Sequence, residues 1–93
     1  MVRPRLRRRV KFIPNVTYYK PRGVPMKLLE VVELNAEEIE SLRLKNVKGL
    51  GQVECAELMK TSQSTFQRIL SSAYKKISKA LVGGMAIKIL TKR

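Results

Sequence analysis

Residues 62–68 (SQSTFQR) carry the side chains whose types and spacing suit the most specific chemistry in this sequence. Glutamine can bond an adenine edge in two places, and arginine can do the same to guanine. Hydroxyl groups suit phosphate oxygens, which position a protein on nucleic acid without specifying its sequence. We therefore expect base contacts from Ser62, Gln63, Ser64, Gln67 and Arg68, and a phosphate contact from Thr65.

The residue inventory excludes most enzyme chemistry, because the chain has no His and a single cysteine, Cys55. A Ser-His-Asp or Cys-His nucleophilic site needs a His. A structural zinc site usually takes four Cys or His ligands. Cys55 is expected to be a small buried apolar residue. The glutamates within 37–40 fit a helix N-terminus, where negative charge is favourable without any catalytic role. We expect no enzyme activity, no cofactor, no metal and no small-molecule substrate.

The net charge of +13 is distributed unevenly along the 93 residues. Residues 1–29 hold nine basic groups and no acid, and residues 60–93 hold eight basic groups and no acid. All seven glutamates lie within residues 30–59, with three basic groups. Two acid-free ends repel each other unless a counter-charge binds, and nucleic-acid phosphates supply one. The sequence shows neither a membrane-spanning apolar run nor a secretion signal, so we expect a cytoplasmic, nucleoid-associated protein.

The N-terminal third is predicted to be extended, because all four prolines precede residue 26. Residues 1–9 are expected to form a basic flexible arm, and residues 10–13 and 16–19 are β-prone. Residues 26–34 show no clear period and are expected to be a connector. The aromatic residues here suit base stacking in principle, but packing in the core is the preferred interpretation. They are Phe12, Tyr18 and Tyr19.

The rest of the chain has helical signals. Asn35 stands three residues before Glu38, as in a capping box, and predicts a helix over 36–47. Its apolar residues are Ile39, Leu42, Leu44 and Val47. A second helix is predicted at about 52–59, with Val53, Cys55, Ala56 and Met59 inward. A third is predicted from 63 to about 82, capped by Ser62, with an inward stripe of Phe66, Ile69, Leu70, Ala73, Ile77, Ala80 and Leu81. Gly83 and Gly84 would end it, and 85–90 reads as a strand that pairs with the N-terminal β segment or with another subunit.

Residues 52–69 have the pattern of a helix-turn-helix, with the small Ala56 where two helices approach and a tight turn at 60–62. This arrangement braces the second helix so that its outer N-terminal side enters the major groove of DNA. Lys60 stands where the turn usually has Gly, so we expect a left-handed backbone there at a cost of roughly 1 kcal/mol. The predicted fold is mainly α: a three-helix helix-turn-helix domain over 35–93, a basic extended segment over 1–34, and short strands near both ends.

Several segments together resemble a known family. They read RPR at 3–5, RRV at 8–10, FxP at 12–14, YYKPxGVP at 18–25, EEIESLRL at 37–44, GLxQ at 49–52, SxxTFxRIL at 62–70 and KKI at 75–77. This combination is similar to uncharacterised protein family 0251 (domain of unknown function 134), small prokaryotic proteins predicted to bind DNA. The resemblance covers nearly the whole chain. It implies a helix-turn-helix similar to region 4 of bacterial sigma factors and a presumed role in binding DNA.

The expected function is sequence-specific binding of double-stranded DNA by a homodimeric transcriptional regulator. Further phosphate or minor-groove contacts are expected from Arg3, Arg5, Arg7, Arg8, Arg9, Lys75 and Lys76. An RNA-binding, ribosome-associated module and a sigma-like protein-interaction adaptor remain as alternatives. The A-form major groove is too narrow to admit a helix, which favours DNA over RNA.

Overall fold

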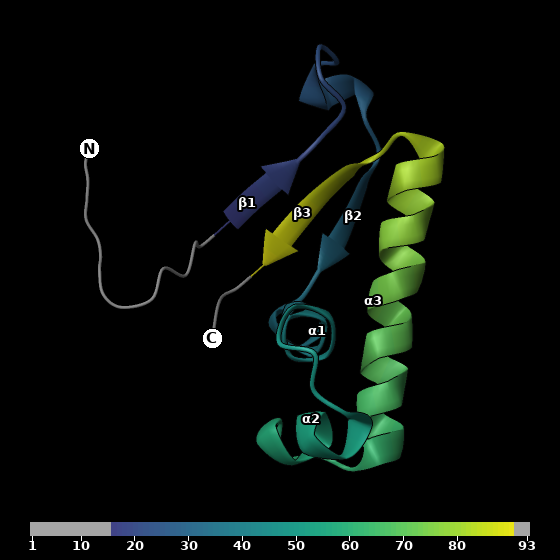
Figure 1. Cartoon of the computed structure of the whole chain (residues 1–93). Coiled ribbons are helices and arrows are strands. Elements are labelled where there is room, and N and C mark those ends of the chain that lie inside the picture. The colour runs from purple at the N-terminus through teal and green to yellow at the C-terminus, as the bar shows by residue number, and fades with distance from the viewer. Residues whose placement is uncertain (1–15, 91–93) are drawn as a thin grey trace, which may run out of the picture.

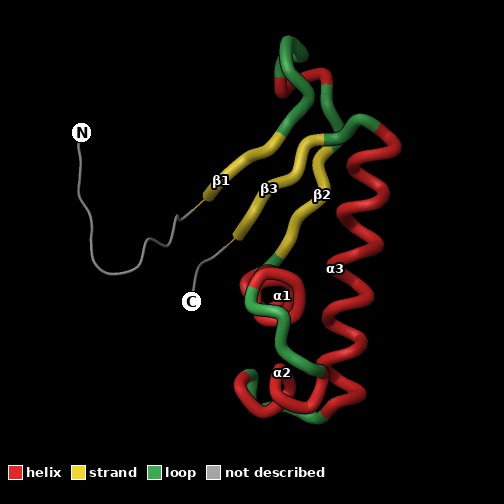
Figure 2. The backbone as a smooth tube through the Cα atoms, in the orientation of Figure 1, coloured by secondary structure: helices red, strands yellow, loops and turns green. Residues whose placement is uncertain are grey.

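The computed structural model describes residues 16–90, which form a mainly helical fold with short strands near both ends (Figures 1 and 2). The strands are β1 (Val16–Tyr19), β2 (Val31–Leu34) and β3 (Ala86–Leu90). The α-helices are α1 (Ala36–Leu42), α2 (Gln52–Leu58) and α3 (Gln63–Gly83). A 3-10 helix, Met26–Leu28, precedes β2, and a π-helical turn, Arg43–Val47, follows α1.

The three strands form one sheet in the order β1-β3-β2. β3 is antiparallel to β1 and parallel to β2. The strand predicted at the C-terminal end is therefore confirmed, and β1 is one of its partners. It does not provide a free pairing edge, however, because it is the central strand with a neighbour on each side. The three helices lie between β2 and β3 in the chain, which gives the crossover that two parallel strands require.

The prediction of a connector over 26–34 was wrong, because this segment contains the 3-10 helix and β2. A four-residue strand is too short to show a period by itself. The sequence of β2, VVEL, alternates only weakly between apolar and polar residues. Its burial nevertheless alternates, since Val31 and Glu33 are exposed, Val32 is half-buried and Leu34 is buried. The parallel pairing with β3 therefore determines this strand more than its own pattern does.

The helix predicted over 36–47 forms, but it changes from α to π at Arg43. The capping box is confirmed at its start: the Asn35 side chain accepts from the Glu38 N–H, and the Glu38 carboxylate accepts from the Asn35 N–H. Leu44 is buried, whereas Val47, which follows it in the series of apolar residues roughly at helical spacing, is 79 % exposed. A π turn is wider than an α turn, so the 3.6-residue spacing of an α-helix does not hold here.

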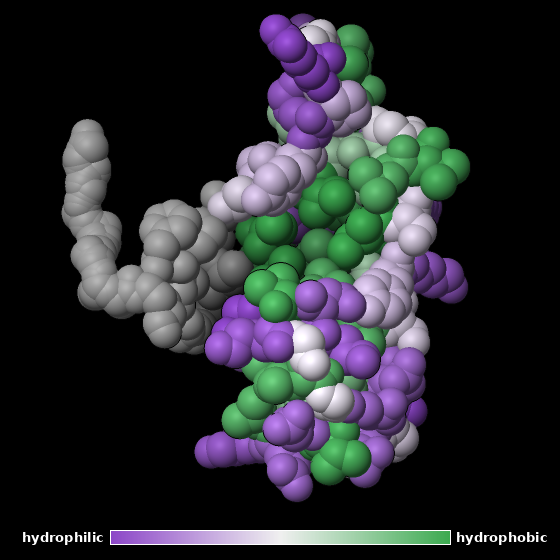
Figure 3. All heavy atoms as spheres, viewed as in Figure 1, coloured by the Kyte–Doolittle hydropathy of each residue, from purple (hydrophilic) through white to green (hydrophobic). Residues whose placement is uncertain are grey.

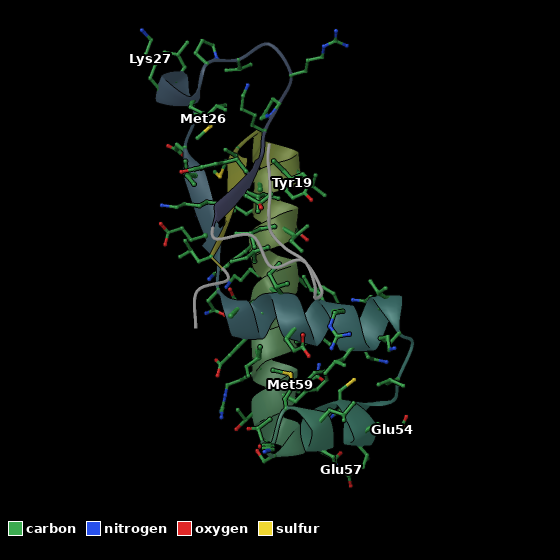
Figure 4. The ribbon with its side chains drawn as sticks, turned by 90° about the vertical axis from the view of Figure 1, so that its left-hand side faces the viewer. Tyr19, Met26, Lys27, Glu54, Glu57 and Met59 are labelled. Carbon is green, nitrogen blue, oxygen red and sulfur yellow. The ribbon has the colours of Figure 1, made fainter. Side chains whose placement is uncertain are left out.

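The core joins α2, α3 and the π-helical turn. Its buried members are Leu44, Cys55, Ala56, Phe66 and Leu70, with Leu42, Leu50 and Met59 packed against them. Figure 4 shows Met59 between α1 and α2. The prediction that Phe66 packs inward beside Cys55 and Met59 is confirmed, as is the burial of Ala56.

Two residues predicted to face inward are exposed instead. Val53 on α2 is 51 % exposed because a helix turns about 200° between it and Cys55, which faces the core. Leu81 on α3 is 74 % exposed because it lies about 100° beyond the buried Ala80. Both side chains add apolar surface to the outside of the molecule without weakening the core.

Candidate nucleic-acid interface

The turn between α2 and α3 has the left-handed residue that its sequence predicts. Lys60 has a φ of 57°, and it is the only residue other than glycine with a positive φ within residues 16–90. The Lys60 N–H donates to the Glu57 carbonyl and the Thr61 N–H to the Ala56 carbonyl, both at 3.0 Å. This is the Schellman arrangement, which usually has Gly at the left-handed position. The turn therefore redirects the chain from α2 into α3 despite the strain at Lys60.

Ser62 begins α3 as its N-cap. Its hydroxyl accepts from the Thr65 N–H at 3.1 Å and also contacts the Thr65 and Ser64 hydroxyls at 3.0 and 3.3 Å. The predicted cap is thus confirmed. These three hydroxyls form one cluster at the helix N-terminus, where backbone N–H groups and the helix dipole favour an anion. In this position Ser62 and Thr65 stabilise the start of the helix and lie where a phosphate could approach.

The three side chains with the greatest capacity to contact bases all point away from the core. Gln63, Gln67 and Arg68 are exposed, while Phe66 between them is fully buried. Within the described part of the chain, none of the three makes a hydrogen bond or an ion pair with another side chain. The helix thus has a rigid inner side and an outer side with unused hydrogen-bonding groups.

The outer side of α3 is free of acid along its whole length, since Gln63–Gly83 contains neither Asp nor Glu. Arg68, Lys75 and Lys79 are exposed there, and a helical rotation of 100° per residue places them within about 40° of one another. The acidic side chains of α2 lie elsewhere. Figure 4 shows Glu54 and Glu57 extending from α2 on the side away from α3.

The side chains of Lys76 and Lys75 differ in their contacts. The Lys76 ammonium lies 2.9 Å from the Glu38 carboxylate and 2.8 Å from the Glu33 carbonyl, so it turns toward α1 and β2. The Lys76 ammonium is therefore engaged within the fold, which leaves it poorly placed for the phosphate contact predicted for it. The neighbouring Lys75 has no such partner among residues 16–90 and stays a candidate.

A network around Glu38 that no sequence pattern predicts fixes α3 against α1. Glu38 is 3 % exposed and accepts hydrogen bonds from Asn35, Ser72 and Lys76. Burial raises the pKa of Glu38, but the hydrogen bonds from Ser72, Asn35 and Lys76 and the Lys76 charge outweigh it, so the pKa is lowered. A capping-box glutamate could be found in the sequence, but its partners lie 34 and 38 residues away, and no local pattern predicts them.

A second cross-link holds the outer side of α3 to the π-helical turn. The Tyr74 hydroxyl and the Asn46 side-chain amide exchange hydrogen bonds of 2.8 and 3.1 Å. Both residues are exposed. Together with the Glu38 network, this pair fixes the direction in which α3 projects from the rest of the fold.

Comparison with known proteins places this chain in a family. The family model described as "Protein of unknown function DUF134" matches residues 1–92. The chain belongs to the UPF0251 family. A UPF0251 protein of Caldanaerobacter subterraneus is 53 % identical over 89 residues, which are 96 % of this chain and 75 % of that relative. A UPF0251 protein of Desulforudis audaxviator is 54 % identical over 89 residues, 96 % of this chain and 58 % of the relative.

No solved structure matches this UPF0251 chain. The family membership confirms the resemblance seen in the sequence, and the family itself is uncharacterised. Between residues 16 and 90, no helix has the length and apolar character needed to cross a lipid bilayer. The predicted contacts of the N-terminal arm lie outside the described residues; they are Arg3, Arg5, Arg7, Arg8 and Arg9.

Proposed function

We propose that this protein binds double-stranded DNA through a helix-turn-helix formed by α2, the turn at 59–62 and the N-terminal turns of α3. The observation that supports this most strongly is the exposure of Gln63, Gln67 and Arg68 on a helix braced from behind by the buried Phe66. An unsatisfied amide or guanidinium group on a rigid helix is what direct base recognition requires.

Each side chain has its own proposed role. Arg68 bonds a guanine edge, and Gln63 and Gln67 bond adenine edges. Ser64 contributes a hydroxyl close to the same bases, whereas Ser62 and Thr65 keep the helix capped and contact a phosphate. These contacts occupy the first two turns of α3, which is the part of a recognition helix that reaches the floor of the groove.

Phosphate neutralisation would come from the later turns of α3 and from the arm. Lys75 and Lys79 lie two to three turns beyond Arg68, on the same side of the helix, where they meet the backbone that borders the groove. The five arginines of the arm add charge that is attracted to any DNA sequence, regardless of its bases. The net charge of +13 is consistent with this role.

The biological role we propose is transcriptional regulation in the cytoplasm, with the protein bound at the nucleoid as a homodimer. A single small recognition unit contacts only a few base pairs. Two copies multiply the affinity and match palindromic sites. RNA binding is the weaker alternative, because an exposed helix side suits the B-form major groove better than the A-form one.

Selection from a pool of random duplex DNA with the full-length protein tests this proposal. We expect enrichment of a short defined sequence, and loss of that enrichment for the Gln67→Ala, Arg68→Ala double variant. Ser71→Ala, which changes another exposed residue of α3, serves as the matched control and should enrich the same sequence. The proposal fails if no sequence is enriched and structured RNA competes with DNA equally well at the same salt concentration.

A further inference from the structure

One edge of the sheet has no partner within residues 16–90. β1 pairs with β3 on one side, and no described strand pairs with its other side. Its sequence, VTYY, contains no charged residue and no proline. Proteins usually protect a free strand edge with charge, proline or a covering element, because such an edge pairs readily with another strand.

The opposite edge of the same sheet is protected. α3 packs along β2 (Figure 1), and the Lys76 ammonium is bonded to the Glu33 carbonyl of that strand at 2.8 Å. β2 also carries the charge of Glu33, which faces Lys88 of β3 at 3.9 Å. The contrast between the two edges shows that the fold leaves only β1 open for pairing in the part of the chain described.

β1 also exposes two large aromatic side chains. Tyr18 is 46 % exposed and Tyr19 is 61 % exposed, so the prediction that they pack in the core was wrong. The register of the sheet places Tyr19 on the same face as Ile87 and Val32. Figure 3 shows hydrophobic side chains in a hollow between the strands and α3. Exposed tyrosines beside apolar surface are typical of protein interfaces.

The charge of the molecule determines what can cover this edge. An acidic partner, nucleic acid included, is attracted to the lysines and arginines and gains nothing from the neutral β1. A second copy of the chain carries the same +13 charge and can approach closely only where basic groups are absent or engaged. β1 has no basic group, the adjacent Lys20 donates to the Pro21 and Val24 carbonyls, and Lys88 lies 3.9 Å from Glu33. A strand edge is also self-complementary, since a two-fold axis pairs an antiparallel strand with its own copy.

We propose that two copies of this protein associate by antiparallel pairing of β1 with β1, which joins their sheets into one of six strands. Successive side chains of a strand point to opposite faces of the sheet, so Tyr19 of each copy covers the apolar hollow beside the shared strands and Tyr18 lies on the other face. The interface lies at the sheet end of the molecule, whereas the N-terminus of α3 lies at the opposite end (Figure 1). Two recognition helices thus stay exposed. The role of the dimer in presenting two recognition helices rests on the proposed DNA binding, but the pairing of β1 with β1 does not.

The interface is small. Two four-residue strands and four tyrosines bury less than the roughly 800 Å² per partner of a standard complex. We therefore expect a dissociation constant on the order of micromolar in the absence of DNA. Sedimentation of the full-length protein should show a reversible monomer–dimer equilibrium at about 1–200 µM, the range that brackets this value.

A substitution pair tests the assignment of the edge. Thr17→Lys places two like charges across the paired strands and should raise the dissociation constant at least about tenfold. Val31→Lys adds the same charge to β2, on a side chain that is already 42 % exposed, and should leave the equilibrium unchanged. Circular dichroism melting checks that both variants are folded.

Cross-linking keeps the test decisive if Thr17→Lys fails to fold. Under mild oxidation, full-length Thr17→Cys or Tyr18→Cys should form a disulfide-linked dimer, because residues near the two-fold axis meet their own copies. Val31→Cys should not. The native Cys55 is fully buried and does not interfere.

Three results would overturn the proposal. The first is a wild-type protein that stays monomeric up to 200 µM, about two orders of magnitude above the expected dissociation constant. The second is cross-linking at Val31→Cys without cross-linking at the β1 cysteines. The third is a dimer whose dissociation constant Thr17→Lys leaves unchanged. If the monomer also shows slow hydrogen exchange at the β1 amides, the occupant of the edge is another part of the same chain. All these measurements omit DNA. A dimer that binds no DNA would contradict the proposed DNA binding and leave the pairing of β1 intact. A monomer that binds DNA would contradict the dimer, including its place in the proposed function, and leave the DNA binding intact.

Discussion

The Lys76 ammonium lies 2.9 Å from the carboxylate of Glu38, so the middle of α3 is tied to the first turn of α1. Glu38 is 3 % exposed, and its carboxylate also receives hydrogen bonds from Asn35 and Ser72. The recognition helix that we propose α3 to be contributes specificity only if its direction is fixed. This pair provides that restraint near the centre of a 21-residue helix.

Replacing Lys76 with methionine should destabilise the fold. The change removes two hydrogen bonds, one of them to a buried carboxylate, and we expect a loss of about 1–3 kcal/mol in the free energy of unfolding. Lys75→Met is the matched control, because Lys75 is exposed and should change the stability by less than about 0.5 kcal/mol. Urea unfolding measures both. Equal effects of the two substitutions would show that the network does not stabilise the fold.

The same network makes stability depend on pH in the acid range. The pKa of Glu38 is lower in the folded protein than its ordinary value of 4.5, so on acidification the unfolded chain takes up this proton first. Its contribution to stability is therefore complete above about pH 4.5 and is lost as the pH falls below that value. We expect Glu38→Gln to flatten the decrease in melting temperature between pH 5 and pH 3. A slope identical to that of wild type would contradict this assignment.

Lys60→Gly should stabilise the protein. Lys60 holds a φ of 57°, which costs a residue with a side chain roughly 1 kcal/mol more than glycine. The gain should appear as a higher midpoint of thermal unfolding, with no change in the enrichment of a DNA sequence. Thr61→Gly, at a neighbour without a positive φ, should give no gain. A decrease in stability for Lys60→Gly would show that the lysine side chain makes a contact that outweighs the strain.

Base recognition and phosphate binding should separate in binding assays. Arg68→Ala should cost about 1–3 kcal/mol on the preferred sequence and relax the preference at one base position. Lys75→Ala, Lys79→Ala should weaken binding to all sequences alike and reduce the slope of log affinity against log salt by up to about two. Fluorescence anisotropy on matched and scrambled duplexes distinguishes the two effects. Identical behaviour of the two variants would rule out this division of roles.

Local signals account for the parts of the fold that could be predicted. The N-caps at Asn35 and Ser62, the left-handed Lys60, the glycine end of α3 and the buried Phe66 each follow from a few adjacent residues, and the structure confirms them. The burial of Phe66 determines which side of α3 faces outward. The predicted base contacts depend on that orientation.

The features that escaped prediction depend on residues far apart in the chain. The strand β2 exists because β3 pairs with it, more than 50 residues later. Lys76 resembles Lys75 in sequence, yet Glu38 and the Glu33 carbonyl withdraw it from the outer surface. Tyr18 and Tyr19 were expected in the core, but an edge strand in a sheet this small leaves them uncovered.

Chemical-shift mapping by NMR tests the central claim most directly, because a 10.6-kDa protein gives resolved spectra. The ¹⁵N-labelled full-length chain would be titrated with a duplex containing the selected sequence. We predict the largest changes for the backbone amides of residues 62–68 and for the side-chain amides of Gln63 and Gln67, with little change at Glu54 and Glu57. Changes concentrated in residues 20–30 or on α1, with the N-terminal turns of α3 unaffected, would contradict the account.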